Sequence, residues 1–100
     1  MALTTIALDD LQVWGQGLHR PEDVAVAKDG RVYASNADAA ISEILADGSL
    51  RNIGHAGGEP NGINLTPDGT TMLIANYDGH VVQACDVANG TVTTICGSCD

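Results

Sequence analysis

The chain contains no phenylalanine and only three aromatic residues, Trp14, Tyr33 and Tyr77. A hydrophobic core must therefore be built from Val, Ile, Leu and Ala, which suit sheets but bury little area per residue. With 100 residues, the chain is long enough for one small domain and marginal as a core that stands alone. We therefore expect that a partner surface or further chain helps to stabilise it.

Positive charge is also scarce. Four Lys and Arg residues stand against thirteen Asp and Glu, which gives a formal net charge of −9. This charge repels phosphate backbones and anionic lipids, so the sequence argues against binding to nucleic acid or to a membrane surface. Several of the acids occur in Asp-Gly pairs, which are typical of tight turns. These pairs are Asp29-Gly30, Asp47-Gly48, Asp68-Gly69 and Asp78-Gly79.

Targeting signals and paired cysteines are missing as well. The opening "MALTTIALDD" has no basic region, and no apolar run approaches the roughly 18 residues of a membrane helix, so a cytoplasmic location is the default expectation. The three cysteines are Cys85, Cys96 and Cys99. The final "CGSC" has redox spacing but no second pair and no following helix, which favours buried or incidental thiols in a reduced compartment.

An internal repeat is the strongest feature that is present. The segment from Pro21 aligns with the segment from Pro60, with a period of 39 residues that drifts to 42. Apolar positions and turn positions both match. Aligned pairs are Val24/Ile63, Val26/Leu65, Asp29/Asp68, Tyr33/Leu73, Asn36/Asn76, Asp38/Asp78 and Ile41/Val81.

Each repeat consists of short β-branched runs separated by turns, which predicts strands. The predicted strands are 23–27, 31–35, 40–45 and 49–54 in the first repeat, and 62–66, 71–76, 80–85 and 91–95 in the second. A helix over "NADAAISEILADG" is the alternative, and the Gly and Val pair in its counterpart favour a strand. Four antiparallel strands in about 40 residues are typical of a propeller blade.

The expected fold is thus all-β, with two four-stranded antiparallel blades and an N-terminal outer strand. The predicted divisions are an N-terminal strand segment at 1–18, a first blade at 19–57 and a second blade at 58–100, with strands at 6–8 and 11–14 in the first segment. Two blades cannot close a ring. We therefore expect either part of a larger propeller or a homo-oligomer, in which three copies would supply six blades.

Two stretches resemble a known family. "GLHRPEDVAVAKDGRVYAS" and "GGEPNGINLTPDGTTMLIANYDG" are similar to the gluconolactonase, senescence-marker-protein and strictosidine-synthase-like group of six-bladed propellers. The resemblance spans residues 11–97, about a third of a family member. The second stretch also resembles YVTN-type and NHL-type repeats, which include many binding modules without catalysis.

The resemblance implies a divalent metal on the propeller axis, held by Glu, Asn and Asp side chains. In this chain the matching positions are Glu22 after Pro21 and Asn61 after Pro60. Asn61 follows in the next blade, whereas the family places this motif several blades later. The implied activity is metal-dependent hydrolysis of a lactone or ester, with Ca²⁺, Mg²⁺, Mn²⁺ or Zn²⁺ as the metal and a small molecule as the substrate.

The repeat supports this placement independently, because Glu22 and Asn61 occupy equivalent positions just before an inner strand. Equivalent positions in successive blades share one rim of the central channel, and both side chains offer the hard oxygen donors that such cations prefer. The alternative is that both are ordinary turn residues. In that case the chain would be part of a non-catalytic propeller that binds a peptide or small ligand.

Other polar residues have simpler interpretations. Asn36 and Asn76 follow the second strand of each repeat and are expected to cap the turn there. His19 and His55 lie in the loops before Glu22 and Asn61, where a general base is conceivable. Neither has a counterpart in the other repeat, which favours surface loop histidines.

Overall fold

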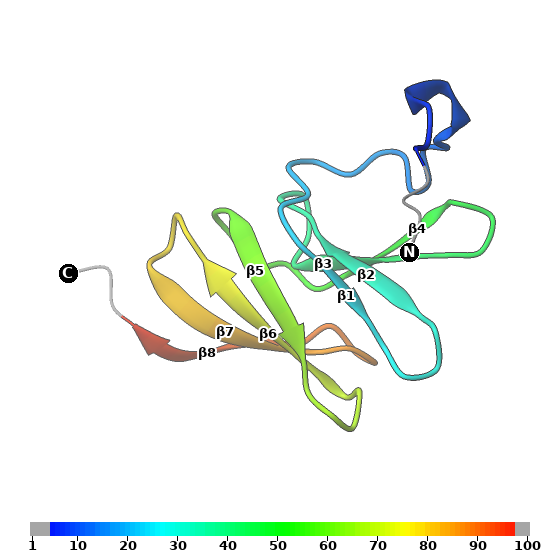
Figure 1. Ribbon diagram of the computed structural model, residues 1–100. Coiled ribbons are helices and arrows are strands. Elements are labelled where there is room, and N and C mark those ends of the chain that lie inside the picture. Colours follow the sequence, from blue (N-terminus) through cyan, green and yellow to red (C-terminus); the bar gives the residue numbers. More distant parts are fainter. Residues whose placement is uncertain (1–4, 98–100) are drawn as a thin grey trace.

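The computed structural model describes residues 5–97 and contains two four-stranded antiparallel sheets (Figure 1). Blade 1 contains β1 (Val24–Val26), β2 (Val32–Ser35), β3 (Ile41–Ile44) and β4 (Leu50–Ile53). Blade 2 contains β5 (Pro60–Leu65), β6 (Thr71–Asn76), β7 (Val81–Asp86) and β8 (Val92–Gly97). In each blade neighbouring strands in the sequence are neighbours in the sheet. The predicted all-β fold and its two four-stranded blades are confirmed.

The helical alternative over "NADAAISEILADG" is wrong, because this segment contains β3, in which all four residues are buried. Ile41 pairs with Ser35 on one side and with Ile53 on the other. A central strand that is covered on both faces has apolar residues without strict alternation, which made the helical spacing a false signal.

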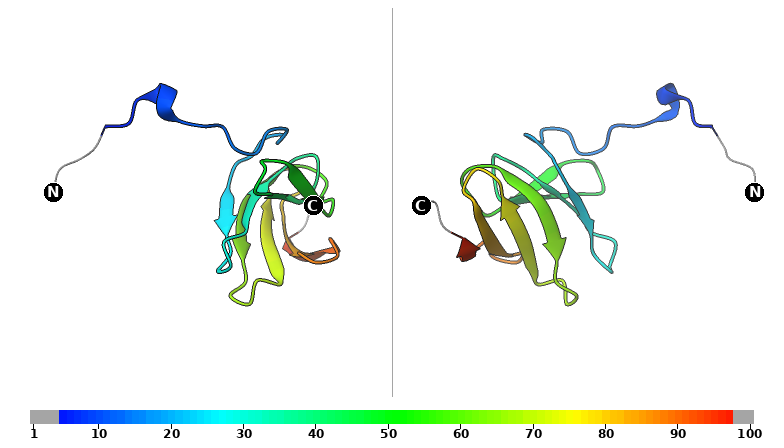
Figure 2. Two further views of the ribbon diagram at one scale, coloured as in Figure 1. Left: turned by 90° about the vertical axis from the view of Figure 1, so that its right-hand side faces the viewer. Right: turned by 60° about the vertical axis from the view of Figure 1, so that its left-hand side comes forward.

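The N-terminal segment differs from the prediction of strands at 6–8 and 11–14. Leu8–Asp10 forms a short 3-10 helix, η1, and residues 11–14 join neither sheet. Each blade already has four strands from its own repeat. Residues 14–19, which we call the strap, instead lie against blade 1, where a Cβ added at Gly15 would approach Ile44 Cδ1 to 2.9 Å. Figure 2 shows the preceding residues extending away from both sheets.

The Asp-Gly turns form as the sequence predicts. Gly30, Gly48 and Gly69 have φ values of 93°, 86° and 76°, a left-handed conformation that glycine adopts without a steric penalty. In each of these turns the Asp carboxylate accepts the N–H of the residue two positions later. These local hydrogen bonds satisfy backbone donors and fix the strand register on both sides of the turn.

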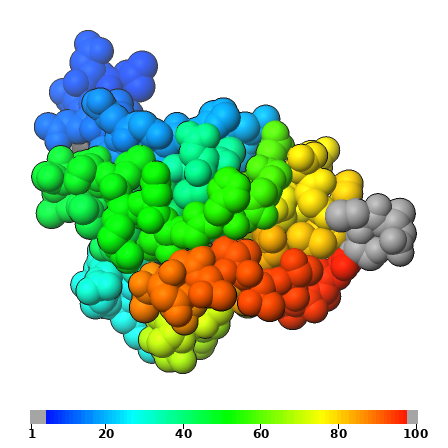
Figure 3. All heavy atoms as spheres, turned by 180° about the vertical axis from the view of Figure 1, so that it is seen from behind, coloured from blue at the N-terminus to red at the C-terminus, as the bar shows by residue number. Residues whose placement is uncertain are grey.

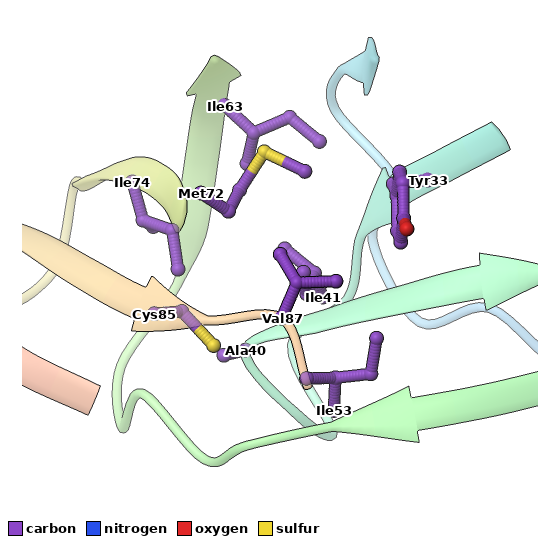
Figure 4. Packing of buried hydrophobic residues seen from close by; sticks show 9 residues of the cluster. All are labelled: Tyr33, Ala40, Ile41, Ile53, Ile63, Met72, Ile74, Cys85 and Val87. Atoms are coloured by element: carbon purple, nitrogen blue, oxygen red, sulfur yellow. The ribbon is translucent and has the colours of Figure 1, made fainter. Parts of the chain in front are cut away.

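The hydrophobic core lies between the two blades (Figure 4). Tyr33, Ile41 and Ile53 come from blade 1, and Ile63, Met72, Ile74 and Cys85 come from blade 2. Figure 4 shows the two sets of side chains facing one another across the gap between the sheets. The edge strands β1 and β5 also contact each other, as expected for the inner strands of successive blades around one axis.

The connection from β4 to β5 passes close to blade 2. A Cβ added at Gly54, which has φ +69°, would lie 2.7 Å from the carbonyl oxygen of Gly90. In the space-filling view of Figure 3, the β7–β8 turn (orange) accordingly lies against the green connecting segment. Only glycine permits this approach without a shift of the backbone. Within residues 5–97 there is no helix long and apolar enough to cross a membrane.

Candidate functional site before the inner strands

Glu22 lies in the turn that leads into β1, and Ser35 fixes this turn. The backbone N–H groups of Glu22 and Asp23 both donate to Ser35 Oγ, at 2.9 and 3.1 Å. Ser35 is fully buried, so the turn is attached to the interior of blade 1. The Glu22 side chain points outward and remains 42% exposed. The backbone at Glu22 is therefore fixed, and the carboxylate is accessible to a ligand.

Asn61 is the second residue of β5 and is also exposed. The β5–β6 register shifts between Pro60 and Ile63, so that one extra residue is accommodated on β5. Such a bulge changes the direction of side chains at a strand end. Asn61 lines a groove of about 420 Å³ together with Tyr77, His80 and Cys96, and Glu22 is not among the lining residues.

Arg20 connects the two segments that precede the inner strands. Its guanidinium lies 3.1 Å from Glu59 Oε1 and 3.6 Å from Glu22 Oε1. Arg20 has a φ of 53° and precedes Pro21. A non-glycine residue in this region is uncommon, and a following proline disfavours helical backbone conformations further. The local fold therefore holds Arg20 in a strained conformation at the site.

Asp23 makes the direct polar link between the inner strands. Its Oδ2 accepts the backbone N–H of Ile63 in β5 at 3.0 Å, while Oδ1 accepts the N–H of Val24 at 2.8 Å. The carboxylate thereby binds a donor that faces out from the edge of blade 2. Sequence reasoning missed Arg20, Asp23 and Glu59. The scarcity of bases was the one signal that could have singled out Arg20.

Asn36 and Asn76 cap turns, as predicted. Asn36 Oδ1 accepts the N–H groups of His19 and Asp38, at 3.2 and 3.0 Å. Asn76 Oδ1 accepts the N–H groups of Glu59 and Gly79 at 3.2 and 3.0 Å. Both asparagines are almost fully buried, and each attaches the segment that leads into the inner strand to the end of the second strand.

The histidines lie on the surface. His19 Nδ1 lies 3.0 Å from Asp38 Oδ1, and both side chains are more than half exposed. His55 is exposed, and His80, also exposed, has a φ of 55° and lines the groove beside Asn61. The sequence offered no reason to select His80, because its position depends on the β6–β7 turn.

The cysteines differ from one another in their environments. Cys85 is buried in the core, and this burial, with a smaller contribution from Asp86, raises the pKa of its thiol. Cys96 is exposed in the groove, and Cys99 lies outside the described residues. The expectation of a buried thiol is met at Cys85.

The donor chemistry at Glu22 and Asn61 fits a hard divalent cation, since a carboxylate just before β1 and an amide oxygen at the start of β5 are both exposed, and these two edge strands contact each other. Their number does not complete a coordination shell. Among residues 5–97, no group of three or more His, Cys, Asp or Glu residues is arranged to hold a metal. A cation bound at these two side chains would need further donors.

Comparisons with known proteins agree with the sequence on the family. The family model described as strictosidine synthase-like, N-terminal, matches residues 6–42. This segment includes the strap, the Glu22 turn and the strands β1 and β2. The resemblance to the gluconolactonase and strictosidine-synthase-like propellers is thereby confirmed. A comparison with curated proteins found no match.

One similar solved structure is a crystal structure of a protein from Bacteroides fragilis described as a candidate 6-phosphogluconolactonase. The identity is 34% and the TM-score is 0.47. The match covers 74% of this chain and 24% of that protein. The chain therefore spans about a quarter of the length of this relative.

Proposed function

We propose that this chain forms two blades of a lactonase-like propeller that hydrolyses a lactone or ester with the help of a divalent metal. The observation that carries the proposal is the placement of Glu22 and Asn61. Glu22 precedes β1 and Asn61 is the second residue of β5, two edge strands in contact, and both side chains are exposed oxygen donors. The family resemblance supports the reaction class, and the fold alone would not.

Within this proposal, Glu22 and Asn61 supply two of the metal ligands. Ser35 positions Glu22 through the two N–H groups it accepts, and Asn76 positions the segment before Asn61 through the N–H of Glu59. A bound Ca²⁺, Mg²⁺, Mn²⁺ or Zn²⁺ would polarise a substrate carbonyl. The remaining ligands and the walls of the substrate pocket come from blades outside this chain.

Arg20 is expected to weaken metal binding, because its guanidinium competes for the Glu22 carboxylate. An exposed ion pair of this kind contributes about 0.2–1 kcal/mol. Arg20→Gln should therefore tighten divalent binding by up to about fivefold, and Glu22→Gln should abolish it. Asp9→Asn, an exposed change in η1, serves as the matched control and should leave binding unchanged.

The test combines calorimetric titration with CaCl₂ and MnCl₂ with an assay for hydrolysis of a sugar δ-lactone, in the protein whose ring closure has been verified by its mass. Specific binding and hydrolysis that are both lost in Glu22→Gln would support the proposal. Absence of both in a closed ring would contradict it, as would equal binding in Glu22→Gln.

A non-catalytic binding propeller is the second candidate. It is favoured by the groove beside blade 2, where Asn61 lies with Tyr77, His80 and Cys96 rather than with Glu22. This grouping combines an aromatic ring with several hydrogen-bonding groups, as small-ligand sites commonly do. The two candidates separate in one experiment, since ligand binding in this groove should persist in Glu22→Gln and be weakened by Tyr77→Ala.

A further inference from the structure

Blade 2 has an uncovered apolar surface on the side that faces away from blade 1. Leu73, Ala75 and Val82 point to this side, because their neighbours Met72 and Ile74 are buried in the joint between the blades, and Gln83, which pairs with Ile74, is buried on the same side as Ile74. We call these three residues the forward patch. Ala75 and Val82 also line the groove that contains Asn61 and Tyr77, so a partner on the forward patch would cover part of that groove. Leu73 is 38% exposed and Val82 is 37% exposed, and Ala75 pairs directly with Val82.

Blade 1 has a second uncovered apolar surface, on the side that faces away from blade 2. Val24 and Val26 of β1 are 57% and 65% exposed, whereas Ala25 between them packs against the core. We call these two valines the rear patch. The strap covers other parts of this side, at Ile44 and Leu50, and leaves β1 free.

The two patches correspond to the two halves of the joint inside the chain. Within blade 1, Ile41 pairs with the residue before Asn36, and within blade 2, Val82 pairs with the residue before Asn76. Counted from the same asparagines, the forward patch residues Leu73 and Val82 are therefore equivalent to Tyr33 and Ile41.

The rear patch follows from the same register. Val24 pairs with Ala34 as Ile63 pairs with Ile74, and Val26 pairs with Val32 as Leu65 pairs with Met72. The rear patch residues are thus equivalent to Ile63 and Leu65. In the joint inside the chain, Ile63 is buried in one cluster with Tyr33 and Ile41, and Leu65 packs against that cluster.

We infer that the forward patch of one copy of this chain packs against the rear patch of a second copy, in a head-to-tail interface that repeats the part of the joint between blades 1 and 2 formed by their inner strands. Each copy carries one free half of each kind, so the interface is heterologous. If each copy repeats the rotation between its own blades, three copies place six blades around one axis. The inference deepens the proposed function, because that function requires a closed ring. It rests on the proposed function only for this requirement.

The charges of the surface agree with a second copy as the partner. Neither patch contains a charged residue, and the carboxylate of Asp23, which borders the forward patch, already accepts two backbone N–H groups. Two copies can therefore meet there despite a net charge of −9 on each. An apolar surface of this type is a liability in a single copy and a docking site in an assembly. The strap occupies the outer strands of blade 1, so the second copy is seated on the side of β1.

The experiment is a mass measurement by light scattering and sedimentation on the full chain. The expected mass is about 31 kDa, three times the 10.3 kDa of one copy. Leu73→Glu in the forward patch and Val26→Glu in the rear patch should each give single copies that retain the circular dichroism of the wild type. Leu8→Glu is the matched control, because Leu8 is 80% exposed in η1 and belongs to neither patch.

Mixing the two patch variants tests the head-to-tail geometry directly. The Leu73→Glu copy keeps its rear patch and the Val26→Glu copy keeps its forward patch, so together they should form a one-to-one pair of about 21 kDa, twice the 10.3 kDa of one copy. This pair cannot grow, since both of its outer patches carry a glutamate.

The outcomes separate the interface from the proposed function. A folded wild-type chain that remains a single copy overturns the interface, and so does an assembly that Leu8→Glu disrupts or a pair formed by Val26→Glu alone. A mass other than that of three copies overturns the six-bladed ring. A ring of three copies that neither binds CaCl₂ or MnCl₂ nor hydrolyses lactones leaves the interface standing and ends the metal-dependent function.

Discussion

Blade 1 and blade 2 have the same repeat pattern but differ in what covers them. Blade 1 has the strap on one side and blade 2 on the other, and Ala34, Ile41 and Ser42 are less than 2% exposed. Blade 2 is covered on one side, and Leu73 and Val82 remain exposed on the other. The repeat therefore determines the strands of each blade and the asparagines that cap its turns. Whether a side chain is buried depends instead on what packs against that face of the blade.

The largest difference is expected between Tyr33 and Leu73, which are equivalent positions with and without a cover. Tyr33 is 2% exposed in the core, so Tyr33→Ala should lower the free energy of unfolding by about 3–5 kcal/mol. Leu73→Ala should change it by less than about 1 kcal/mol at low protein concentration. Urea unfolding measures both.

Protein concentration sharpens this comparison. If a second copy covers the forward patch, Leu73→Ala should lower the free energy of unfolding by more as the protein concentration rises, because association stabilises the folded state by mass action. The cost of Tyr33→Ala should not rise in the same way. Leu73 is described as uncovered within one copy. A large loss in the free energy of unfolding from Leu73→Ala that does not depend on protein concentration would contradict this description.

The two capping asparagines should give the next largest effects. Asn76 Nδ2 donates to the Gly57 carbonyl at 2.6 Å and to Gln83 Oε1 at 3.1 Å, in addition to the two N–H groups that Oδ1 accepts. Asn76→Ala leaves buried groups without hydrogen-bond partners and should lower the free energy of unfolding by about 3 kcal/mol. Asn36→Ala should lower it by about 2 kcal/mol. Thermal and urea unfolding measure both changes.

Asn64→Ala is the control for these two variants, since Asn64 is an exposed residue in β5 and should change stability by about 0.5 kcal/mol or less. Equal and small effects at Asn36 and Asn76 would show that the caps do not hold the inner strands in place.

The two cysteines of blade 2 should differ in reactivity. In a Cys99→Ser background, a maleimide at neutral pH should label Cys96 at least about tenfold faster than Cys85. Cys85 is fully buried and burial raises the pKa of its thiol, so less thiolate is present near neutral pH. Mass spectrometry of quenched samples gives both rates, and denaturant should remove the difference. Equal rates in the native protein would contradict the packing of β7.

The smallest effect is expected at the β5–β6 turn. Hydrogen bonds from the Thr66 hydroxyl, the Thr70 N–H and the Thr70 hydroxyl lower the pKa of Asp68 below its usual 3.8. A lowered pKa in the folded state contributes stability that is present above about pH 4 and is lost as the pH falls through the folded value. The thermal midpoint of Asp68→Asn should therefore fall less steeply below about pH 4 than that of the wild type.

Thr66→Val provides a second variant for this turn, because it removes the hydroxyl that is the largest cause of the shift. It should reduce the same pH-dependent part of the stability. If the thermal midpoints of both variants fell below about pH 4 as steeply as that of the wild type, the turn would not stabilise the charged carboxylate.

Much of the fold could be predicted because turn residues and apolar runs carry local information. The strands at 71–76 and the turn at Asp68-Gly69 follow from such signals, and the structure has them where expected. The alignment of Ile41 with Val81 was wrong by one position. Ile41 corresponds to Val82 because the β6–β7 connection contains one more residue, and a sequence alignment without the hydrogen bonds cannot locate that insertion.

The candidate site was less accessible to prediction. The repeat placed Glu22 before β1 as the structure has it, whereas Asn61 lies within β5 rather than before it. The ion pair of Arg20 with Glu59 depends on a strained φ angle that no local pattern indicates. The outward path of residues 5–13 was missed for another reason. Their alternating apolar residues resemble a strand, and no free edge of either blade takes them up.

The carboxylate of Asp23 has a consequence for how an assembly would come apart. It ties blade 1 to the Ile63 N–H within one copy, and its counterpart in blade 2 is Gly62, which has no side chain to offer. A joint between copies would therefore lack the hydrogen bond that every joint inside a copy has. On dilution or heating, a ring should open at the seams between chains first, and each released piece should keep its two blades together.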